Sequence, residues 1–185
     1  MPEYGTVLLN RATGQRLVIR RTVAQTRGRS IELSITYPPH GPRPPGHIHP
    51  EQEQVVEVLS GGLCAALDGR PTTLAAGGVL VVPAGAPHAL WNAGADEARA
   101  VLHLSPALSS QALLETLWAL GSAGRTDRRG MPDILQAAVL LRAYRREFRL
   151  AWPPHSIQRP LVAALAPLGS LCGRPSRLTS PAGDG

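Results

Sequence analysis

The feature that most constrains the fold is a series of short strand-like segments between residues 30 and 104, each bounded by Gly, Pro, Asp or Asn. Residues 30–37, SIELSITY, alternate apolar and polar side chains, which is typical of a strand with one buried face. The sequence NRATGQ, residues 10–15, predicts a hairpin turn before a second strand. Further strands are predicted at 55–59, 63–67, 72–74, 79–82, 89–91 and 98–104. Regular spacing of this kind favours an all-β sandwich or barrel.

After Pro106 the apolar period changes from that of strands to that of helices. Helices are predicted over 109–121 and 131–150, and a last apolar segment, 156–173, is interrupted by Pro160 and Pro167. We therefore expect a β-barrel in residues 1–106, a helical extension packed on it in 107–173, and a disordered tail in 174–185.

The charge pattern argues against nucleic acid as a partner. All 19 basic residues are Arg, and the formal net charge is +6, but the arginines are scattered and match no nucleic-acid motif. Arg142, Arg145, Arg146 and Arg149 recur at helical spacing and predict one basic stripe. The stripe is interpreted as a solvated face, with docking to an acidic partner or a membrane surface as the alternative.

The remaining composition favours a cytoplasmic protein. Cys64 and Cys172 have no CxxC spacing, which fits a reducing compartment better than a disulfide framework. The N-terminus has no apolar leader, and no apolar run approaches the ~18 residues of a membrane span. We therefore expect no transmembrane segment.

Three histidines are candidate metal ligands. His47 and His49 are two residues apart, so on a strand both imidazoles point the same way and can converge on one ion. The turn PAGAPH presents His88 from a neighbouring strand as a third imidazole, and Asn92 can bridge backbone groups nearby. A divalent transition metal fits this set: Fe, Mn, Ni, Cu or Zn.

The spacing of these residues resembles the two motifs of the cupin superfamily. The first motif is carried by Gly41, His47, His49, Gln54 and Gly61, and the second by Gly77, Pro83, Gly85, His88 and Asn92. The resemblance covers residues 30–105 and implies a double-stranded β-helix, or jelly-roll barrel, with a metal site inside. The helical extension is similar to that of small bacterial single-domain cupins. By the same resemblance we expect a homodimer.

The first motif departs from the family at Gln54, where metal-binding cupins usually have a glutamate ligand. Glu53 directly precedes it and is the alternative fourth ligand. With Gln54 inward, Val56 and Val58 share its face, whereas an inward Glu53 would also bury Glu57, which is costly for unpaired carboxylates. Parity therefore favours Gln54 inside. This neutral side chain cannot act as a base, which puts dioxygenase-like chemistry in doubt.

Strand parity also indicates which other side chains face the pocket. Tyr37 and Leu90 are candidate pocket residues, whereas Trp91, out of phase with Leu90, is expected to pack under the helices or at a subunit interface. His103 is expected to point outward. His40 and His155 lie in Pro-rich loops without a nameable partner.

Two classes of function fit these observations. The first is a metal-dependent enzyme acting on a small anionic or enolisable molecule, either an oxygenase or an isomerase or cyclase, with the metal as Lewis acid. The alternative is a non-catalytic ligand-binding or regulatory module whose metal site is impaired by Gln54. The sequence does not identify a catalytic residue.

Overall fold

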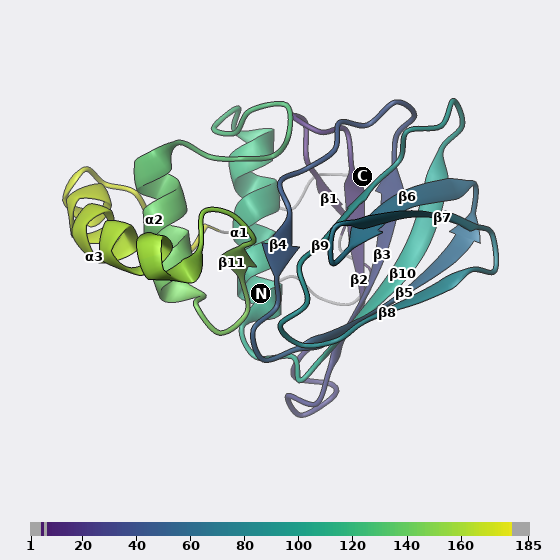
Figure 1. Ribbon diagram of the computed structural model, residues 1–185, viewed down its shortest axis with the longest axis horizontal. Coiled ribbons are helices and arrows are strands. Elements are labelled where there is room, and N and C mark those ends of the chain that lie inside the picture. The colour runs from purple at the N-terminus through teal and green to yellow at the C-terminus, as the bar shows by residue number, and fades with distance from the viewer. Residues whose placement is uncertain (1–4, 6, 179–185) are drawn as a thin grey trace.

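Two antiparallel sheets and three helices make up the protein in a computed structural model that describes residue 5 and residues 7–178. The strands are β1 (Val7–Leu9), β2 (Arg16–Arg21), β3 (Ile31–Tyr37), β4 (His47–Ile48), β5 (Glu53–Ser60), β6 (Gly62–Leu67), β7 (Arg70–Ala75), β8 (Val79–Val82), β9 (His88–Trp91), β10 (Ala98–Ser105) and β11 (Arg149–Leu150). The helices are α1 (Ser110–Ser122), α2 (Ile134–Ala143) and α3 (His155–Leu171). Figure 1 shows the strands gathered at one end and the helices at the other.

The two sheets form the barrel. One has the order β1-β2-β3-β10-β5-β8 and the other β11-β4-β9-β6-β7. Side chains such as Leu33, Val56, Val58 and Leu63 are buried in the core between them. The predicted all-β jelly-roll barrel with a C-terminal helical extension is confirmed.

Local sequence patterns account well for the barrel strands. Along β3, the apolar residues Ile31 to Tyr37 at alternate positions are all buried, while the polar residues between them are half-buried. The predicted turn at residues 10–15 joins β1 to β2 as a hairpin, closed by Asn10 N–H donating to the Gln15 carbonyl at 2.8 Å. The alternation of apolar and polar residues and the residue types of a turn are local features, so they predict these strands without knowledge of the fold.

The second predicted helix, 131–150, is wrong beyond residue 143. α2 begins after Asp133, whose side chain accepts from Leu135 N and Gln136 N, and it ends at Ala143. The chain then turns back, and β11 pairs antiparallel with β4 in the register Arg149↔Ile48 and Leu150↔His47. Pairing with a barrel strand overrides the helical propensity of this segment.

The predicted arginine stripe is therefore wrong as well. Arg142 lies on α2, Arg145 and Arg146 in the turn that follows it, and Arg149 on β11. Arg146 points to the barrel, where its Nη2 is 2.7 Å from a carboxylate oxygen of Glu51. These arginines do not share one helix face.

The last apolar segment forms α3, which packs on α2 (Figure 1). The helix continues through Pro160 and Pro167, both of which are exposed. Gly169 lies so close to α2 that a Cβ there would be 2.7 Å from the Leu135 carbonyl oxygen. This glycine allows the two helices to approach.

The end of the described chain is bound to the helices. The amide of Leu178 donates to Thr116 on α1, and the Gln136 side chain on α2 donates to the Pro175 carbonyl. Residues 179–185 of the predicted tail lie outside the described residues. Across the part of the chain that is described, none of the helices combines the length and apolar character needed to cross a membrane.

Candidate metal centre and cavity

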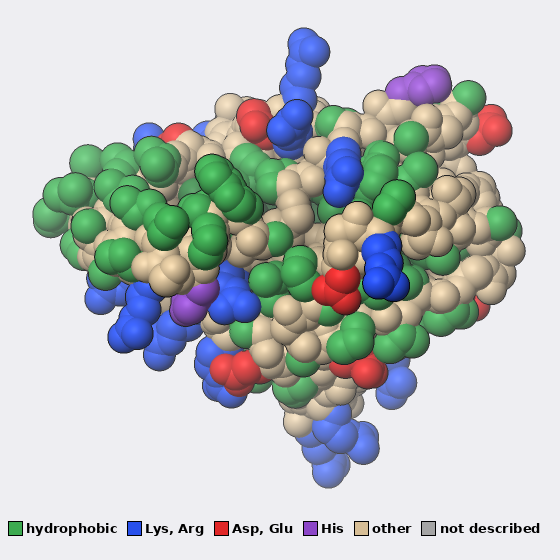
Figure 2. Space-filling model, viewed as in Figure 1, with side chains coloured by type: hydrophobic (Ala, Val, Ile, Leu, Met, Phe, Trp, Pro, Cys, Tyr) green, Lys and Arg blue, Asp and Glu red, His purple; other side chains and the backbone are tan. Residues whose placement is uncertain are grey.

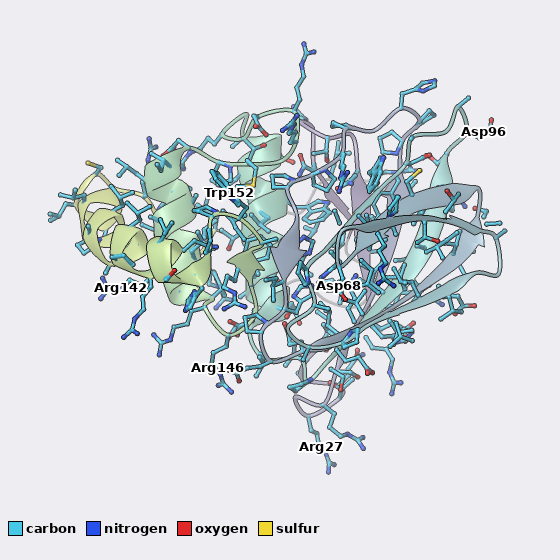
Figure 3. The ribbon with its side chains drawn as sticks, in the orientation of Figure 1. Arg27, Asp68, Asp96, Arg142, Arg146 and Trp152 are labelled. Atoms are coloured by element: carbon cyan, nitrogen blue, oxygen red, sulfur yellow. The ribbon has the colours of Figure 1, made fainter. Side chains whose placement is uncertain are left out.

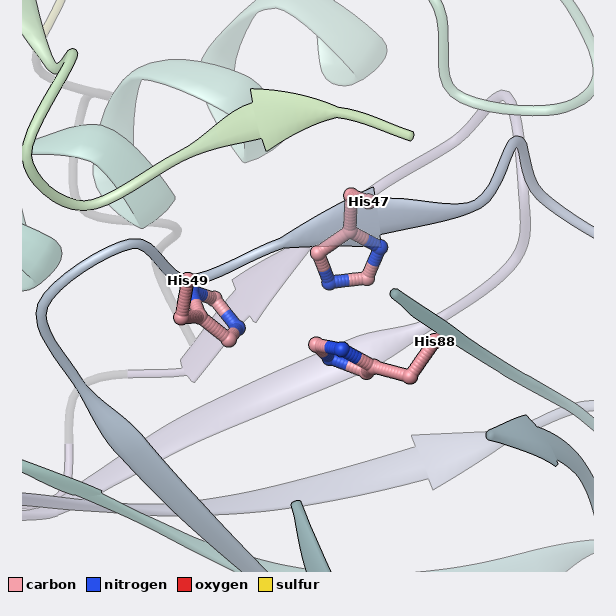
Figure 4. Close-up of side chains that lie close together, drawn as sticks. All are labelled: His47, His49 and His88. Atoms are coloured by element: carbon pink, nitrogen blue, oxygen red, sulfur yellow. The ribbon is translucent and has the colours of Figure 1, made fainter. Parts of the chain in front are cut away.

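The three histidines predicted as metal ligands come together inside the barrel. His47 lies on β4 directly opposite His88 at the start of β9, and His49 follows β4. The nitrogen atoms of the three rings that can act as ligands lie within 4.8 Å of one another, and Figure 4 shows the rings facing a common space. This group can hold a metal ion.

Backbone carbonyl groups fix the tautomers of two of these rings. His49 Nδ1 is 2.7 Å from the Glu147 carbonyl oxygen, and His88 Nδ1 is 3.0 Å from the Ala86 carbonyl oxygen. Because a carbonyl oxygen only accepts, each Nδ1 carries the proton and each Nε2 keeps its lone pair. His88 Nε2 is buried without a hydrogen-bond partner. An unsatisfied buried lone pair is what a metal ligand presents before it binds.

Burial keeps all three rings neutral near neutral pH. Burial is the largest cause lowering the pKa of His47, followed by the neighbouring His88 and His49. It also lowers the pKa of His49, against hydrogen bonds with Glu147 and Gln54, and lowers that of His88 to about 4. Neutral imidazole is the form that binds metal, so no proton must first be removed.

The structure places Gln54 inside the barrel and Glu53 on its outer surface. Gln54 is 3% exposed and its amide oxygen is 2.8 Å from His49 Nε2, whereas Glu53 is exposed. With the proton of His49 on Nδ1, the Gln54 amide group must turn its NH₂ toward Nε2, and a half-turn of the same amide presents oxygen instead. Gln54 can therefore satisfy His49 alone or offer a neutral oxygen to a cation.

The helical extension supplies two residues at the centre that the sequence analysis missed. Glu147 orients His49 through its carbonyl oxygen, while its buried carboxylate accepts from Ser109 N at 2.9 Å. The Phe148 ring stacks on His47, with centroids 5.2 Å apart and planes at 25°. The sequence contains one feature that could have drawn attention to Glu147, because it is a lone acidic residue among arginines.

A cavity of about 230 Å³ opens beside His47 and His49 and is lined mainly by apolar side chains. Tyr37 and Leu90, the predicted pocket residues, line it, and burial raises the pKa of Tyr37, which keeps its hydroxyl group protonated. Trp91, expected elsewhere, also lines this cavity, with the Arg43 guanidinium 4.8 Å from its ring centre. The expectation for Trp91 is therefore wrong.

Helix α1 contributes to the wall of the cavity. Leu113, Leu117 and Trp118 from α1 line the cavity, as does Leu140 from α2. Trp118 Nε1 is buried with no hydrogen-bond partner. A ligand oxygen would satisfy this N–H group, because an unpaired buried donor costs free energy.

The other motif residues shape the loops around the histidines. Gly61 has φ +71°, and a Cβ there would lie 2.5 Å from the Glu97 carbonyl oxygen, so only glycine fits. Gly85 donates its N–H to the His49 carbonyl, which ties the Pro83–Gly85 turn to the site, and Gly77 donates to Val58. Asn92 donates to the Tyr37 and Asp96 carbonyls, and its own carbonyl accepts from Gly41 N.

The remaining histidines lie away from the centre. His103 is on the outer side of β10, 3.8 Å from Glu32. His40 lies in the loop before β4, and His155 begins α3. Both cysteines are free: Cys64 lies on β6 and Cys172 follows α3.

Part of this chain is similar in sequence to known proteins. Residues 33–104 match the family model described as a cupin domain. A Streptomyces cyaneus protein named polyketide synthase CurC is 41% identical over 85 residues, which are 46% of this chain and 53% of that protein. The chain thus spans about half the length of the curated relative it matches.

Solved structures are similar to this chain at low sequence identity. An RmlC-like cupin from Shewanella frigidimarina is 17% identical with a TM-score of 0.50, covering 60% of this chain and 96% of that one. The polyketide cyclase RemF from Streptomyces resistomycificus is 20% identical with a TM-score of 0.45, covering 57% and 70% respectively.

Proposed function

Because residues 33–104 of this chain form a cupin domain of the cupin superfamily, we propose that its barrel is a metal-dependent site acting on a small enolisable molecule. The observation that carries the proposal is the unpartnered Nε2 of His88, which faces a space shared with His47 and His49. In this proposal the three histidines hold a divalent transition metal, and Gln54 offers a neutral oxygen as fourth donor.

The cavity lining supports substrates that ionise easily. None of the described residues that line the cavity is acidic, and in this proposal the three histidines hold the metal. Without a carboxylate base, the site favours compounds whose C–H bond is already acidic, such as 1,3-dicarbonyl compounds. When bound, the metal supplies Lewis acidity toward a carbonyl or enolate oxygen.

The chain's own residues then bind and orient the molecule. The apolar side chains of α1 and β3 exclude water from its carbon skeleton, and the Trp118 N–H group donates to a second oxygen. These features support an isomerase or cyclase more than an oxygenase. The relative named polyketide synthase supports the same substrate class, since a polyketide chain contains repeated 1,3-dicarbonyl units.

A non-catalytic binding module is the second candidate. Gln54 favours it, because a site without a carboxylate retains a metal less tightly and lacks an obvious base. Such a module would bind the same class of compound in the cavity and release it unchanged.

Metal content and enolisation test the proposal together. We expect the tag-free protein to retain near-stoichiometric transition metal in elemental analysis, and the His88→Ala variant to lose it. His103→Ala, which removes an exposed histidine, is the matched control and should retain metal. Metal-loaded wild type should accelerate deuterium exchange at the central carbon of acetylacetone at least tenfold over His88→Ala, followed by NMR.

Each alternative gives a different result in the same experiment. Oxygen uptake with acetylacetone would point to an oxygenase. Binding without faster exchange would point to the binding module. A wild type that neither contains metal nor takes it up would end the metal-dependent proposal.

A further inference from the structure

A second cavity, of about 390 Å³, lies outside the barrel among α2, β11 and α3. Its polar lining is dominated by Arg142, Arg145, Arg149, Arg159 and His155. Figure 2 shows basic side chains gathered along the lower side of the helical extension, with a histidine among them. Figure 3 shows Arg142 extending there, far from Arg27 on the barrel.

The charges of these four arginines are largely uncompensated by the acidic residues that the structure describes, although Arg145, after Arg146, helps to lower the pKa of Glu51. None of them forms a salt bridge with another described residue, and no acidic side chain lines the cavity. Elsewhere in the extension, by contrast, Arg146 pairs with Glu51 and Arg174 with Asp133. Residues 134–178 contain seven arginines and one acidic residue, Glu147, whose carboxylate is committed to Ser109.

The cavity is built on ordered elements. Arg149 is half-buried and its backbone pairs with Ile48, so its position is fixed by the barrel. The Gln158 side chain donates to the Leu150 carbonyl at 2.8 Å and to the Pro153 carbonyl, which anchors α3 to β11. The backbone segments that carry Arg149 and Arg159 are therefore held in place.

The start of α3 adds to the positive potential. His155 is its first residue, and no side chain caps the N-terminus of this 17-residue helix. Its first N–H groups and the helix dipole favour an anion at this end. The helix dipole therefore attracts an anion, as the four guanidinium groups do.

We propose that this cavity binds a phosphate-bearing anion, and that a diphosphate group matches it best. Guanidinium groups pair with phosphate oxygens through two parallel hydrogen bonds, which makes arginine the preferred residue for this chemistry. A single carboxylate would leave most of the uncompensated charge in place, whereas a diphosphate neutralises most of it. A soluble phosphate ester and a lipid headgroup both provide this chemistry.

This site is distinct from the one in the barrel, but the two are neighbours. Leu141 and Phe148 line both cavities, and Phe148 stacks on His47. The anion site needs no metal, so it can be tested whether or not the barrel binds one.

Calorimetric titration with sodium pyrophosphate tests the proposal. We expect one pyrophosphate per chain for the wild type and at least tenfold weaker binding for the double variant Arg145→Gln/Arg149→Gln. Arg70→Gln, which removes an exposed arginine on β7, is the matched control and should bind like the wild type. Binding should weaken as salt concentration rises. Should the first double variant fail to fold, Arg142→Gln/Arg159→Gln provides the same test.

Sedimentation with phosphatidic acid vesicles distinguishes the two sources of phosphate. Pyrophosphate binding without vesicle binding assigns the site to a soluble phosphate compound. Arginine-dependent vesicle binding without pyrophosphate binding assigns it to a lipid headgroup. The proposal is overturned if the wild type binds neither probe, or if the arginine variants bind as tightly as the wild type.

Discussion

Gln54 determines the charge of the candidate metal centre. Burial keeps His47, His49 and His88 neutral, and the buried side chain of Gln54 beside His49 is neutral as well. A divalent ion in this set would keep its full positive charge. Such a site favours an anionic ligand from solution, such as an enolate, over a neutral one. The same neutrality makes the metal easier to lose.

Gln54→Glu should therefore bind metal more tightly. A carboxylate at this position adds a Coulombic attraction inside the barrel, and we expect Kd to fall at least about tenfold, or about 1.4 kcal/mol. Competition with a chromogenic chelator measures Kd. Glu53→Gln is the matched control, because Glu53 is exposed, and its Kd should not change. Equal affinity of Gln54→Glu and wild type would contradict a role for residue 54 as a ligand.

At the scale of elements, the short strand β11 connects the helical extension to the histidines. It adds an edge strand beside β4, and the turn before it brings Glu147 and Phe148 against His49 and His47. Glu147 also links this turn to the start of α1 through Ser109. The extension is thus part of the wall of the candidate centre.

The α2–α3 contact depends on the missing side chain of Gly169. In an exposed helix, Gly→Ala stabilises by up to about 1 kcal/mol. At Gly169 the new Cβ would meet the Leu135 carbonyl oxygen at 2.7 Å and Val139 at 2.8 Å, so we expect Gly169→Ala to lower the free energy of unfolding by about 1–3 kcal/mol. Urea unfolding measures this change.

Ala164, an exposed residue of α3, shows how much helix propensity alone changes stability. Ala164→Gly should lower the free energy of unfolding by about 1 kcal/mol through helix propensity alone. A Gly169→Ala protein more stable than wild type would show that α2 and α3 do not approach as described.

At the scale of the whole molecule, the buried histidines link stability to pH. Their pKa values are lowered in the folded protein, that of His88 to about 4 from an ordinary 6.5. Between these values the unfolded chain binds more protons than the folded one, so stability falls as pH falls. Each unit of lowering corresponds to about 1.4 kcal/mol.

The metal-free protein should accordingly unfold at lower urea concentration at pH 5 than at pH 7. The His88→Gln variant should lose part of this pH dependence, because its side chain does not titrate in this range. The Arg70→Gln variant, changed at an exposed residue of β7 that does not titrate in this range, should keep the wild-type dependence. A urea midpoint independent of pH in the wild type would contradict the burial of neutral histidines.

Local sequence patterns predict the barrel strands, the shared side of His47 and His49, and the inward side of Gln54. These depend on alternation along single strands and on turns of a few residues, which are local properties of the chain. Tertiary contacts instead determine the end of α2, the packing of α3, the contacts of Glu147 and Phe148, and the arginine-lined cavity. Glu147 reaches His49 across 98 residues of sequence, and a contact of that range leaves no periodic signal.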